Sequence, residues 1–325
     1  MIRASISGAV AASLLVLVAP ASHAAERLVV SSGHQGGWDS LVTAFGVRKG
    51  IFQEQGLDVE IVDIDTGAPM LQAVVSGSID VAIGVGMPGF IGAVMKDAPL
   101  KMVSANFTGA PDLGWYVRAE SPIKSFADIA RDNTVGYSSN GSSTQIVLLA
   151  LMKQAGVDGQ PVAAGNATAT LTQVMTGQID VGYDGNGGMG ISEFQRGDVR
   201  FIGSGADLES YRDQTVRGIV VTVETLAKRR DALIDFLAAY QQAIDWMYQD
   251  PVAYEWFAEA IKTSVAEAKT TVQRIYPRAA LQLGPVQGLD RTIVQSVEFK
   301  RIPAAPTAEQ IAKMFEYIGP SPAGK

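Results

Sequence analysis

The sequence predicts an α/β protein built from two lobes of similar architecture. Two stretches, 71–81 and 171–181, carry Leu, Val, Gly, Ile, Asp and Val at equivalent places. In each copy an amphipathic helix stops at a glycine, a tight turn follows, and a buried apolar strand begins. Strands and helices also alternate ahead of each copy, which indicates parallel sheets with right-handed crossovers. A repeat this long indicates two lobes built alike rather than a solenoid.

The elements ahead of the two copies correspond one to one. In the first lobe we expect a strand at 28–31, a helix at 38–49 that stops at Gly50, and a strand at 59–63. In the second lobe we expect a strand at 134–137, a helix at 144–154 that stops near Gly156, and a strand at 162–164. Each lobe therefore reads as βαβαβ.

Two short stretches rich in Val, Ile, Tyr and Trp, 114–118 and 217–223, are expected to connect the lobes as a pair of hinge strands. The implied division is a first lobe over 25–113, a second lobe over 114–216, and a return to the first lobe over 217–325.

The returning segment reads as a helical tail that packs on the first lobe. We expect helices at 225–249 and 251–262, followed by two helices that open with capping boxes at 264–267 and 307–310.

The N-terminus has the pattern of a secretory signal peptide over 1–24. Arg3 is followed by an apolar run at 10–19, and Ser22 and Ala24 occupy the small-residue positions of a cleavage site. The run is shorter than the ~20 residues that span a bilayer, which disfavours an uncleaved anchor. We expect cleavage after Ala24, a periplasmic protein, and no membrane insertion of the mature chain.

Composition excludes several functional classes. The chain has no cysteine, which rules out a lipid-modified N-terminal cysteine, disulfides, thiolate metal sites and cysteine catalysis. It has two histidines, one of them inside the signal segment, so we expect no catalytic residues, no metal and no cofactor. A net charge of −7 without basic clusters argues against nucleic acid as a partner.

Several motifs resemble those of the periplasmic binding proteins of nitrate, sulfonate, taurine and thiamine-precursor ABC importers. They are RKGIFQEQGLDVE at 48–60, Thr66-Gly67, SGSIDVA at 76–82, APLKMV at 98–103, and GIVVTV at 218–223. The resemblance covers essentially the mature chain. It implies a two-lobed type II periplasmic binding protein fold that closes on a small solute, a membrane permease as partner, ATP hydrolysis in a separate protein, and a monomer.

In open parallel sheets a ligand lies beyond the carboxyl ends of the strands. Asp80 and Asp180 precede their strands, so we assign them to turn and strand-entry chemistry rather than to the ligand. The loops after the strands supply the candidates, with glycines that let the backbone approach a solute. The expected ligand-binding residues are Gly33, His34, Gly37, Trp38, Thr66, Gly86, Met87, Asn106, Asn140, Ser142, Ser143, Thr144, Asp184 and Arg217.

Two of these positions admit two interpretations each. The loop at 138–144 opens into a helix whose free N–H groups favour an anion, while Ser142 or Ser143 also caps that helix. Trp38 either covers an apolar ligand face at the cleft or anchors the following helix in the core.

Asp184 and Arg217 bear on the charge of the ligand. A carboxylate at Asp184 would repel a simple anion and suit an amine or a ring N–H, and Arg217 would pair with Asp184 or with an acidic ligand group. We therefore favour an aliphatic sulfonate of the taurine type over bare nitrate. A nitrogen heterocycle such as a thiamine-precursor pyrimidine, and a periplasmic sensor that does not transport, are the alternatives.

Overall fold

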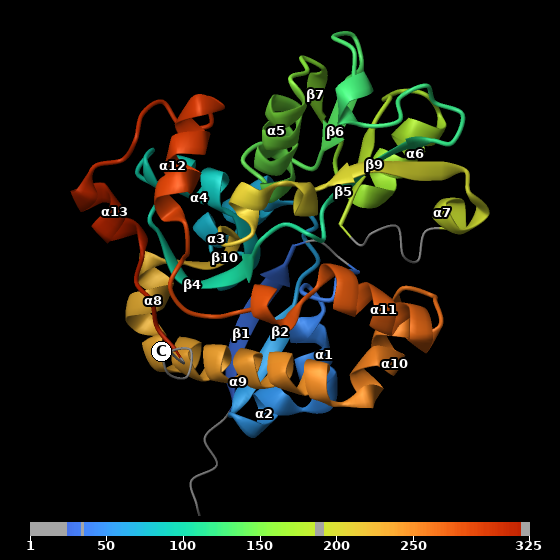
Figure 1. The fold of residues 1–325 in the computed structure, drawn as a ribbon. Helices are drawn as coiled ribbons and strands as arrows, with labels where there is room; N and C mark the ends of the chain where they lie inside the picture. The colour runs from blue at the N-terminus through green and yellow to red at the C-terminus, as the bar shows by residue number, and fades with distance from the viewer. Residues whose placement is uncertain (1–24, 34–35, 186–191, 320–325) are drawn as a thin grey trace, which may run out of the picture.

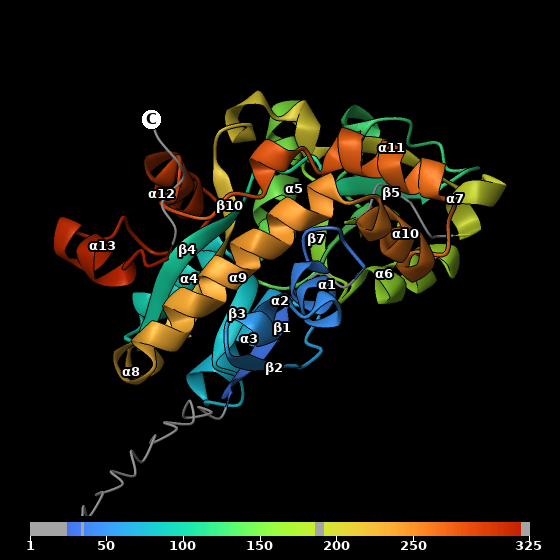
Figure 2. The ribbon, with the colours of Figure 1, turned by 90° about the horizontal axis from the view of Figure 1, so that it is seen from below.

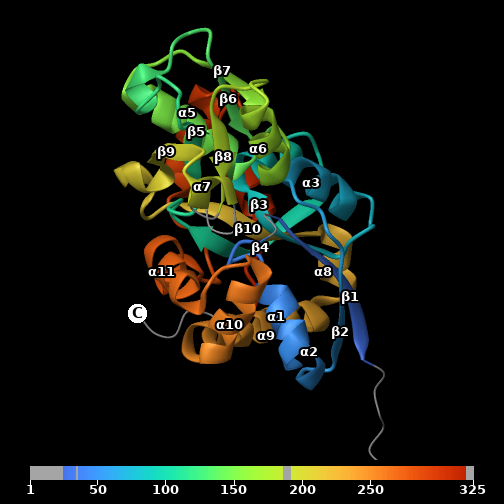
Figure 3. The same ribbon diagram turned by 90° about the vertical axis from the view of Figure 1, so that its right-hand side faces the viewer.

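The computed structural model describes residues 25–33, 36–185 and 192–319. The expected signal peptide at 1–24 and the candidate His34 lie outside these residues. Within them two α/β lobes are stacked, with the second lobe above the first in Figure 1 and Figure 3. No helix of this described part is long and apolar enough to cross a membrane.

The first lobe is built on a five-stranded sheet in the order β2-β1-β3-β10-β4. The first three strands of the chain are parallel to one another, whereas β10 is antiparallel to both of its neighbours, β3 and β4. The strands are β1 (Glu26–Ser32), β2 (Leu57–Ile61), β3 (Val81–Gly86), β4 (Leu100–Thr108) and β10 (Thr215–Thr222).

The second lobe repeats this topology. Strands β6 and β7 pair in parallel, a parallel bridge between Val135 and Val181 leads to β8, and β5 pairs antiparallel with β8 and β9. The resulting order, β7-β6-β8-β5-β9, corresponds strand for strand to that of the first lobe. The strands are β5 (Gly114–Arg118), β6 (Thr134–Tyr137), β7 (Gln160–Ala163), β8 (Gly182–Asp184) and β9 (Val199–Ser204). The duplicated architecture predicted from the sequence is confirmed.

The chain crosses between the lobes twice, and each crossing leads into an interior strand of a sheet. After the first crossing, 109–113, the chain forms β5, and after the second, 205–214, it forms β10. The two β-rich stretches that we expected to connect the lobes are therefore paired within the sheets, and the connecting peptides directly precede them. These peptides are joined to each other, because Gly109 N donates to Gln214 O (2.9 Å) and Gly205 N donates to Leu113 O (2.8 Å).

The strands of the first sheet are apolar on both faces because helices cover both. Along β10, Ile219 and Val221 belong to one core cluster and Val220 belongs to the other. Helices α1, α2 and α9 pack on the first face, and Figure 2 shows α9 running across it. Helices α3 and α4 cover the other face and carry α12 against them. These helices are α1 (Val42–Lys49), α2 (Ile51–Glu54), α3 (Gly67–Val75), α4 (Met87–Val94), α9 (Arg230–Gln249) and α12 (Leu289–Glu298).

The helical tail packs against the first lobe, as expected, mainly through α9, and α8, α12 and α13 add further contacts. Ser264 and Thr307 form the two predicted capping boxes. The remaining helices are α5 (Ser143–Ala155), α6 (Ala167–Met175), α7 (Ser192–Arg196), α8 (Val223–Lys228), α10 (Pro251–Ala260), α11 (Val265–Ile275) and α13 (Ala308–Met314), with short 3₁₀ turns η1 (Phe126–Asp128), η2 (Gly205–Asp207), η3 (Glu209–Tyr211) and η4 (Arg278–Ala280).

Two helix boundaries differ from the prediction. The expected helix at 225–249 is two helices that meet at Arg229, whose φ of −128° is not helical. The side chain of Arg229 forms ion pairs with Glu26 and Asp80 at the edge of the sheet. The helix expected to begin at Trp38 begins at Val42, because the preceding residues form a turn on Gly37 O.

Candidate functional site

A small cavity lies where the carboxyl ends of the parallel strands of both lobes meet. Its volume is about 20 Å³. This is the position at which open α/β sheets bind ligands. The described residues that line it are Gly33, Asp65, Gly67, Gly84, Gly86, Ser138, Ser142, Ser143 and Arg217.

The first lobe contributes the ends of β1, β2 and β3 to the cavity wall. Gly84 is an extra residue in β3, because Ile83 and Val85 face the consecutive residues Ile219 and Gly218 of β10. Its φ of +81° is one that residues with side chains rarely adopt. This glycine bulge bends the strand next to the cavity, as bulges beside binding sites commonly do.

The second lobe contributes the first turn of α5. Ser142 is the N-cap, since its Oγ accepts a hydrogen bond from Gln145 N (3.2 Å). Thr144 Oγ1 lies 2.8 Å from the hydroxyl oxygens of both Ser138 and Ser142 and accepts a hydrogen bond from Ser138 N (2.9 Å). This network fixes the loop, so the N-terminus of a thirteen-residue helix, with its partial positive charge, lies at the cavity.

The two lobes touch each other around the cavity. Gly89 N in α4 donates to Gly141 O ahead of α5 (2.9 Å), and Asn166 Nδ2 donates to Asp65 Oδ2 (2.9 Å). A Cβ atom on Gly86 would lie 2.7 Å from Gly141 O, so only glycine fits there without a shift of the backbone. Contacts between the lobes therefore lie directly beside the cavity, which in this arrangement is too small to hold a solute larger than water.

Arg217 is the buried cation of the site. Its guanidinium, in a side chain that is 2% exposed, lies 2.8 Å from Asp112 Oδ2 and 3.6 Å from Asp39 Oδ2, and 4.2 Å from the ring centroid of Phe107. Burial raises the pKa of Asp112 to about 7, against the opposing effect of Arg217, and it raises the pKa of Asp39 as well. Burial disfavours the charge of Arg217 itself, but the two carboxylates outweigh it and raise the arginine pKa.

Of the residues predicted from the sequence, the structure brings Gly33, Gly86, Ser142, Ser143 and Arg217 together at the cavity. A second group supports the wall from behind. Thr144 holds the α5 loop, Asn140 Oδ1 accepts from Tyr137 Oη (2.8 Å), and Thr66 lies between the lining residues Asp65 and Gly67.

Of the two interpretations of Trp38, the structure supports the one in which its side chain anchors the following helix in the core. Its ring is fully buried and contacts Phe45, Tyr248, Tyr254 and Phe257, with the ring of Tyr254 stacked on it at 5.1 Å. Three of these aromatic partners come from the helical tail, so the indole joins the tail to the start of α1.

The remaining candidates are buried and are not among the described residues that line the cavity. Met87 belongs to the core beneath α4, and Asn106 Nδ2 donates to Tyr240 Oη (3.2 Å). Gly37 O accepts the backbone hydrogen bonds of the turn that precedes α1. Asp184 is the last residue of β8 and pairs with Gly114 of β5.

Three acidic residues escaped the sequence reasoning. Asp65 lines the cavity, and Asp39 and Asp112 hold Arg217. Asp65 could have been predicted, because it lies in the loop after β2 and ligands bind beyond the carboxyl ends of parallel strands. Asp112 in the first crossing and Arg217 in β10 are far apart in sequence, so no local pattern pairs them.

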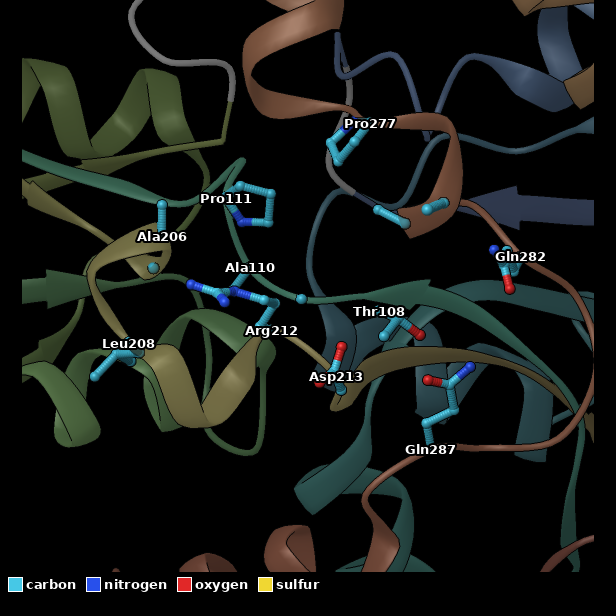
Figure 4. A pocket seen from close by; sticks show the side chains of 14 residues that line it. Thr108, Ala110, Pro111, Ala206, Leu208, Arg212, Asp213, Pro277, Gln282 and Gln287 are labelled. Atoms are coloured by element: carbon cyan, nitrogen blue, oxygen red, sulfur yellow. The ribbon is translucent and has the colours of Figure 1, made fainter.

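A larger hollow, about 620 Å³, lies at the crossing peptides (Figure 4). Its wall includes Gly109, Ala110 and Pro111 of the first crossing, Ala206 and Arg212 of the second, and the segment around η4. No parallel strand ends in it among its described lining residues, so we assign the binding site to the smaller cavity.

Solved structures with the same fold share most of the chain. The aliphatic sulphonate-binding protein of Escherichia coli is 20% identical, with a TM-score of 0.68 over 92% of this chain and 95% of that protein. The alkanesulfonate-binding protein of Xanthomonas axonopodis pv. citri, bound to MOPS, is 15% identical, with a TM-score of 0.72 over 91% and 99%. The nitrate-binding protein of Synechocystis is 14% identical, with a TM-score of 0.67 over 89% and 86%.

These likenesses confirm the two-lobed type II periplasmic binding protein fold that the sequence motifs implied. No curated protein sequence matches the chain significantly. The model of the family described as NMT1/THI5 like matches residues 42–254, which include most of the first lobe, the whole second lobe and the start of the tail. The chain belongs to the NMT1/THI5-like family.

Proposed function

We propose that this protein is the solute-binding component of an ABC importer, and that its cargo is a small aliphatic sulfonate of the taurine type. The family, the two-lobed fold and the names of the sulfonate-binding neighbours support this function. The cargo binds between the lobes, and a membrane permease takes it from the closed protein. The chain acts by binding rather than by catalysis.

The observation that carries the choice of cargo is the composition of the cavity wall. Its described residues are glycines, serines, Asp65 and Arg217, and none of them is aromatic. A flat heterocycle binds best where a ring covers its face, and the indole of Trp38 is occupied in the core. The α5 N-terminus and Arg217 suit an anionic group on a compact aliphatic solute.

Closure of the lobes is the proposed mechanism of capture. The lobes, taken as 25–113 with 217–325 and as 114–216, move about the paired crossing peptides. Contacts that the cargo makes with both lobes favour the closed arrangement by their differential binding free energy. The protein works as a monomer, since one chain supplies both walls of the cavity.

A thermal-shift screen tests the cargo class. Taurine, ethanesulfonate, nitrate and an aminopyrimidine are each added to the purified protein. A true ligand at one hundred times its dissociation constant stabilises the folded protein by about 2.7 kcal/mol. Stabilisation by a sulfonate supports the proposal, whereas stabilisation by the aminopyrimidine alone replaces it with heterocycle transport.

Localisation and transport are tested in cells. We expect the mature protein in the periplasmic fraction, with Ala25 as its first residue by mass spectrometry. Deletion of the gene is expected to abolish uptake of the radiolabelled ligand. Normal uptake by the deletion strain would instead favour a periplasmic sensor.

A further inference from the structure

Arg217 keeps two hydrogen-bond donors unused at the cavity. Its Nη2 faces Asp112 and Asp39, but Nε and Nη1 are buried and have no hydrogen-bond partner among the described residues. Buried donors that remain unpaired are unfavourable, and they are more so on a charged group. Each of these N–H groups can donate one charge-assisted hydrogen bond to an oxyanion.

Asp112 and Asp39 hold the guanidinium of Arg217 in a fixed position and leave part of its positive charge uncompensated. Asp112 and Asp39 hold Nη2, which orients the plane of the guanidinium, and the ring of Phe107 lies 4.2 Å from its central carbon. Burial raises the pKa of both carboxyl groups, that of Asp112 to about 7, which opposes full neutralisation of the guanidinium by this pair. Positive charge is therefore left for an incoming acid group.

Asp65 offers the opposite charge at the same cavity. Asn166 of the second lobe donates to its Oδ2 (2.9 Å), whereas Oδ1 is buried and has no partner among the described residues. A carboxylate oxygen in this setting accepts hydrogen bonds from an ammonium group. Because Asp65 already bonds to the opposite lobe, an ammonium bound to it would add to the contacts that close the cleft.

We infer that the cleft recognises a compact zwitterion, whose acid group binds Arg217 and the α5 N-terminus and whose ammonium group binds Asp65. This inference rests on the proposed function and defines the chemistry of the cargo. Arg217 and Asp65 line one small cavity, so only a few bonds separate the acid from the amine of the ligand. An amino sulfonate or a short amino acid meets this description.

Isothermal titration calorimetry with five probes tests the double recognition. Taurine, β-alanine and glycine carry both charges, ethanesulfonate carries only the acid, and ethylamine carries only the amine. We expect at least one zwitterion to bind, and both single-charge probes to bind at least about tenfold more weakly than it does. Equal affinity for taurine and ethanesulfonate, with no binding of the amino acids, would overturn the inference.

An isosteric substitution identifies the residue that binds the amine. Asp65→Asn keeps the hydrogen bond with Asn166 possible but removes the negative charge. We therefore expect it to lower the affinity for the zwitterion at least about tenfold and to leave the affinity for ethanesulfonate unchanged. Asp63→Asn is the matched control, because Asp63 is an exposed acid in the same loop. Equal weakening of both ligands by Asp65→Asn would reject the role of Asp65.

Arg217→Lys tests the acid end. Lysine retains a cation beside Asp112 and Asp39 but loses the Nε and Nη1 donors, so the affinities for the zwitterion and for ethanesulfonate are expected to fall by the same factor. Circular dichroism establishes that this variant is folded. Unchanged affinity for both ligands in the folded variant would reject Arg217 as the acid receptor.

The screen separates failure of this inference from failure of the proposed function. If sulfonates bind with or without an amine, the proposed cargo class stands and the zwitterion inference falls. If only the aminopyrimidine binds, both fall.

Discussion

Asp112 ties the stability of the protein to pH. The folded protein keeps a proton on this buried carboxyl up to about pH 7, whereas the unfolded chain loses it near the ordinary pKa of 3.8. Between these values the folded form binds more protons, so rising pH lowers the free energy of unfolding, by up to about 1.4 kcal/mol per pH unit for one proton. Asp39, Arg217 and Tyr276 are the ionisable neighbours that share this environment.

We expect Asp112→Asn to remove that contribution. Urea denaturation at a series of pH values from 5 to about 7.5 should show a smaller loss of stability with rising pH in the variant than in the native protein. Asp132→Asn, at an exposed acid, is the control and should follow the native curve. Parallel curves for the native protein and Asp112→Asn would contradict the expectation.

Trp38 is expected to matter for stability and not for the ligand. Trp38→Ala removes a fully buried indole from four aromatic neighbours and should lower the free energy of unfolding by about 3–5 kcal/mol. Ligand affinity, measured by calorimetry well below the melting temperature, should change less than about threefold. A larger loss of affinity in the folded variant would place the indole in contact with the cargo.

The role of a residue can be predicted from the sequence when it depends on the neighbours of that residue along the chain. Ser142 follows a strand and precedes a helix, so its cap and its place at the cavity were both predictable. Trp38 occupies a similar loop, but its partners lie in the distant helical tail. Arg217 was identified as a site cation, whereas its partners Asp39 and Asp112 come from the turn before α1 and from the first crossing, so their pairing depends on tertiary packing.

At the scale of elements, the N-terminus of α5 carries both stability and recognition. Ser142→Ala removes the cap of α5 and one partner of Thr144, which should lower the free energy of unfolding by about 1 kcal/mol. We also expect weaker binding of an anionic ligand, because the first turn at the cavity loses its support. Melting curves and calorimetry measure the two effects.

Ser264→Ala is the matched control for this cap. It removes the N-cap of α11, which lies outside the cavity wall, so a similar loss of stability is expected without a change in affinity. If both variants altered affinity equally, the effect of Ser142→Ala would come from stability alone.

The order of elements was predictable because it is encoded locally. Apolar periodicity, stop glycines and capping boxes placed the repeated βαβαβ elements of both lobes and most of the helical tail, whereas β9, α7 and α12 were not predicted. The exception at Arg229 is tertiary in origin, since the break in the helix is accompanied by ion pairs to Glu26 and Asp80 on other elements. The bulge at Gly84 likewise depends on pairing with β10, a strand that the chain forms much later.

At the scale of the whole molecule, closure depends on glycines where the lobes meet. A Cβ on Gly89 would lie 2.9 Å from Gly141 O of the other lobe, whereas a Cβ on Gly92 in the same helix would have only ordinary contacts at 3.6 Å. Both substitutions to alanine raise helix propensity equally. We expect Gly89→Ala, but not Gly92→Ala, to disfavour closure and weaken ligand binding about tenfold or more.

Small-angle X-ray scattering measures the closure directly. At a ligand concentration that saturates the native protein, Gly89→Ala should show a larger radius of gyration than Gly92→Ala. The melting temperatures of the two variants without ligand should be similar. Equal radii and equal affinities would show that the contact between α4 and the α5 loop does not limit closure.

The first sheet contains a strand, β10, that the chain forms only after it has returned from the second lobe, and this constrains the order of folding. In the first sheet β4 pairs with β10, and β10 joins it to β3, so a polypeptide emerging from the ribosome or the export channel leaves β4 without its neighbour until residue 215 and beyond have appeared. The segment from β5 to β9 contains all five strands of its own sheet and has no such delay. The lobe that begins last along the sequence is thus able to assemble first, and the N-terminal segment of the first lobe, 25–113, waits for the C-terminal third of the chain.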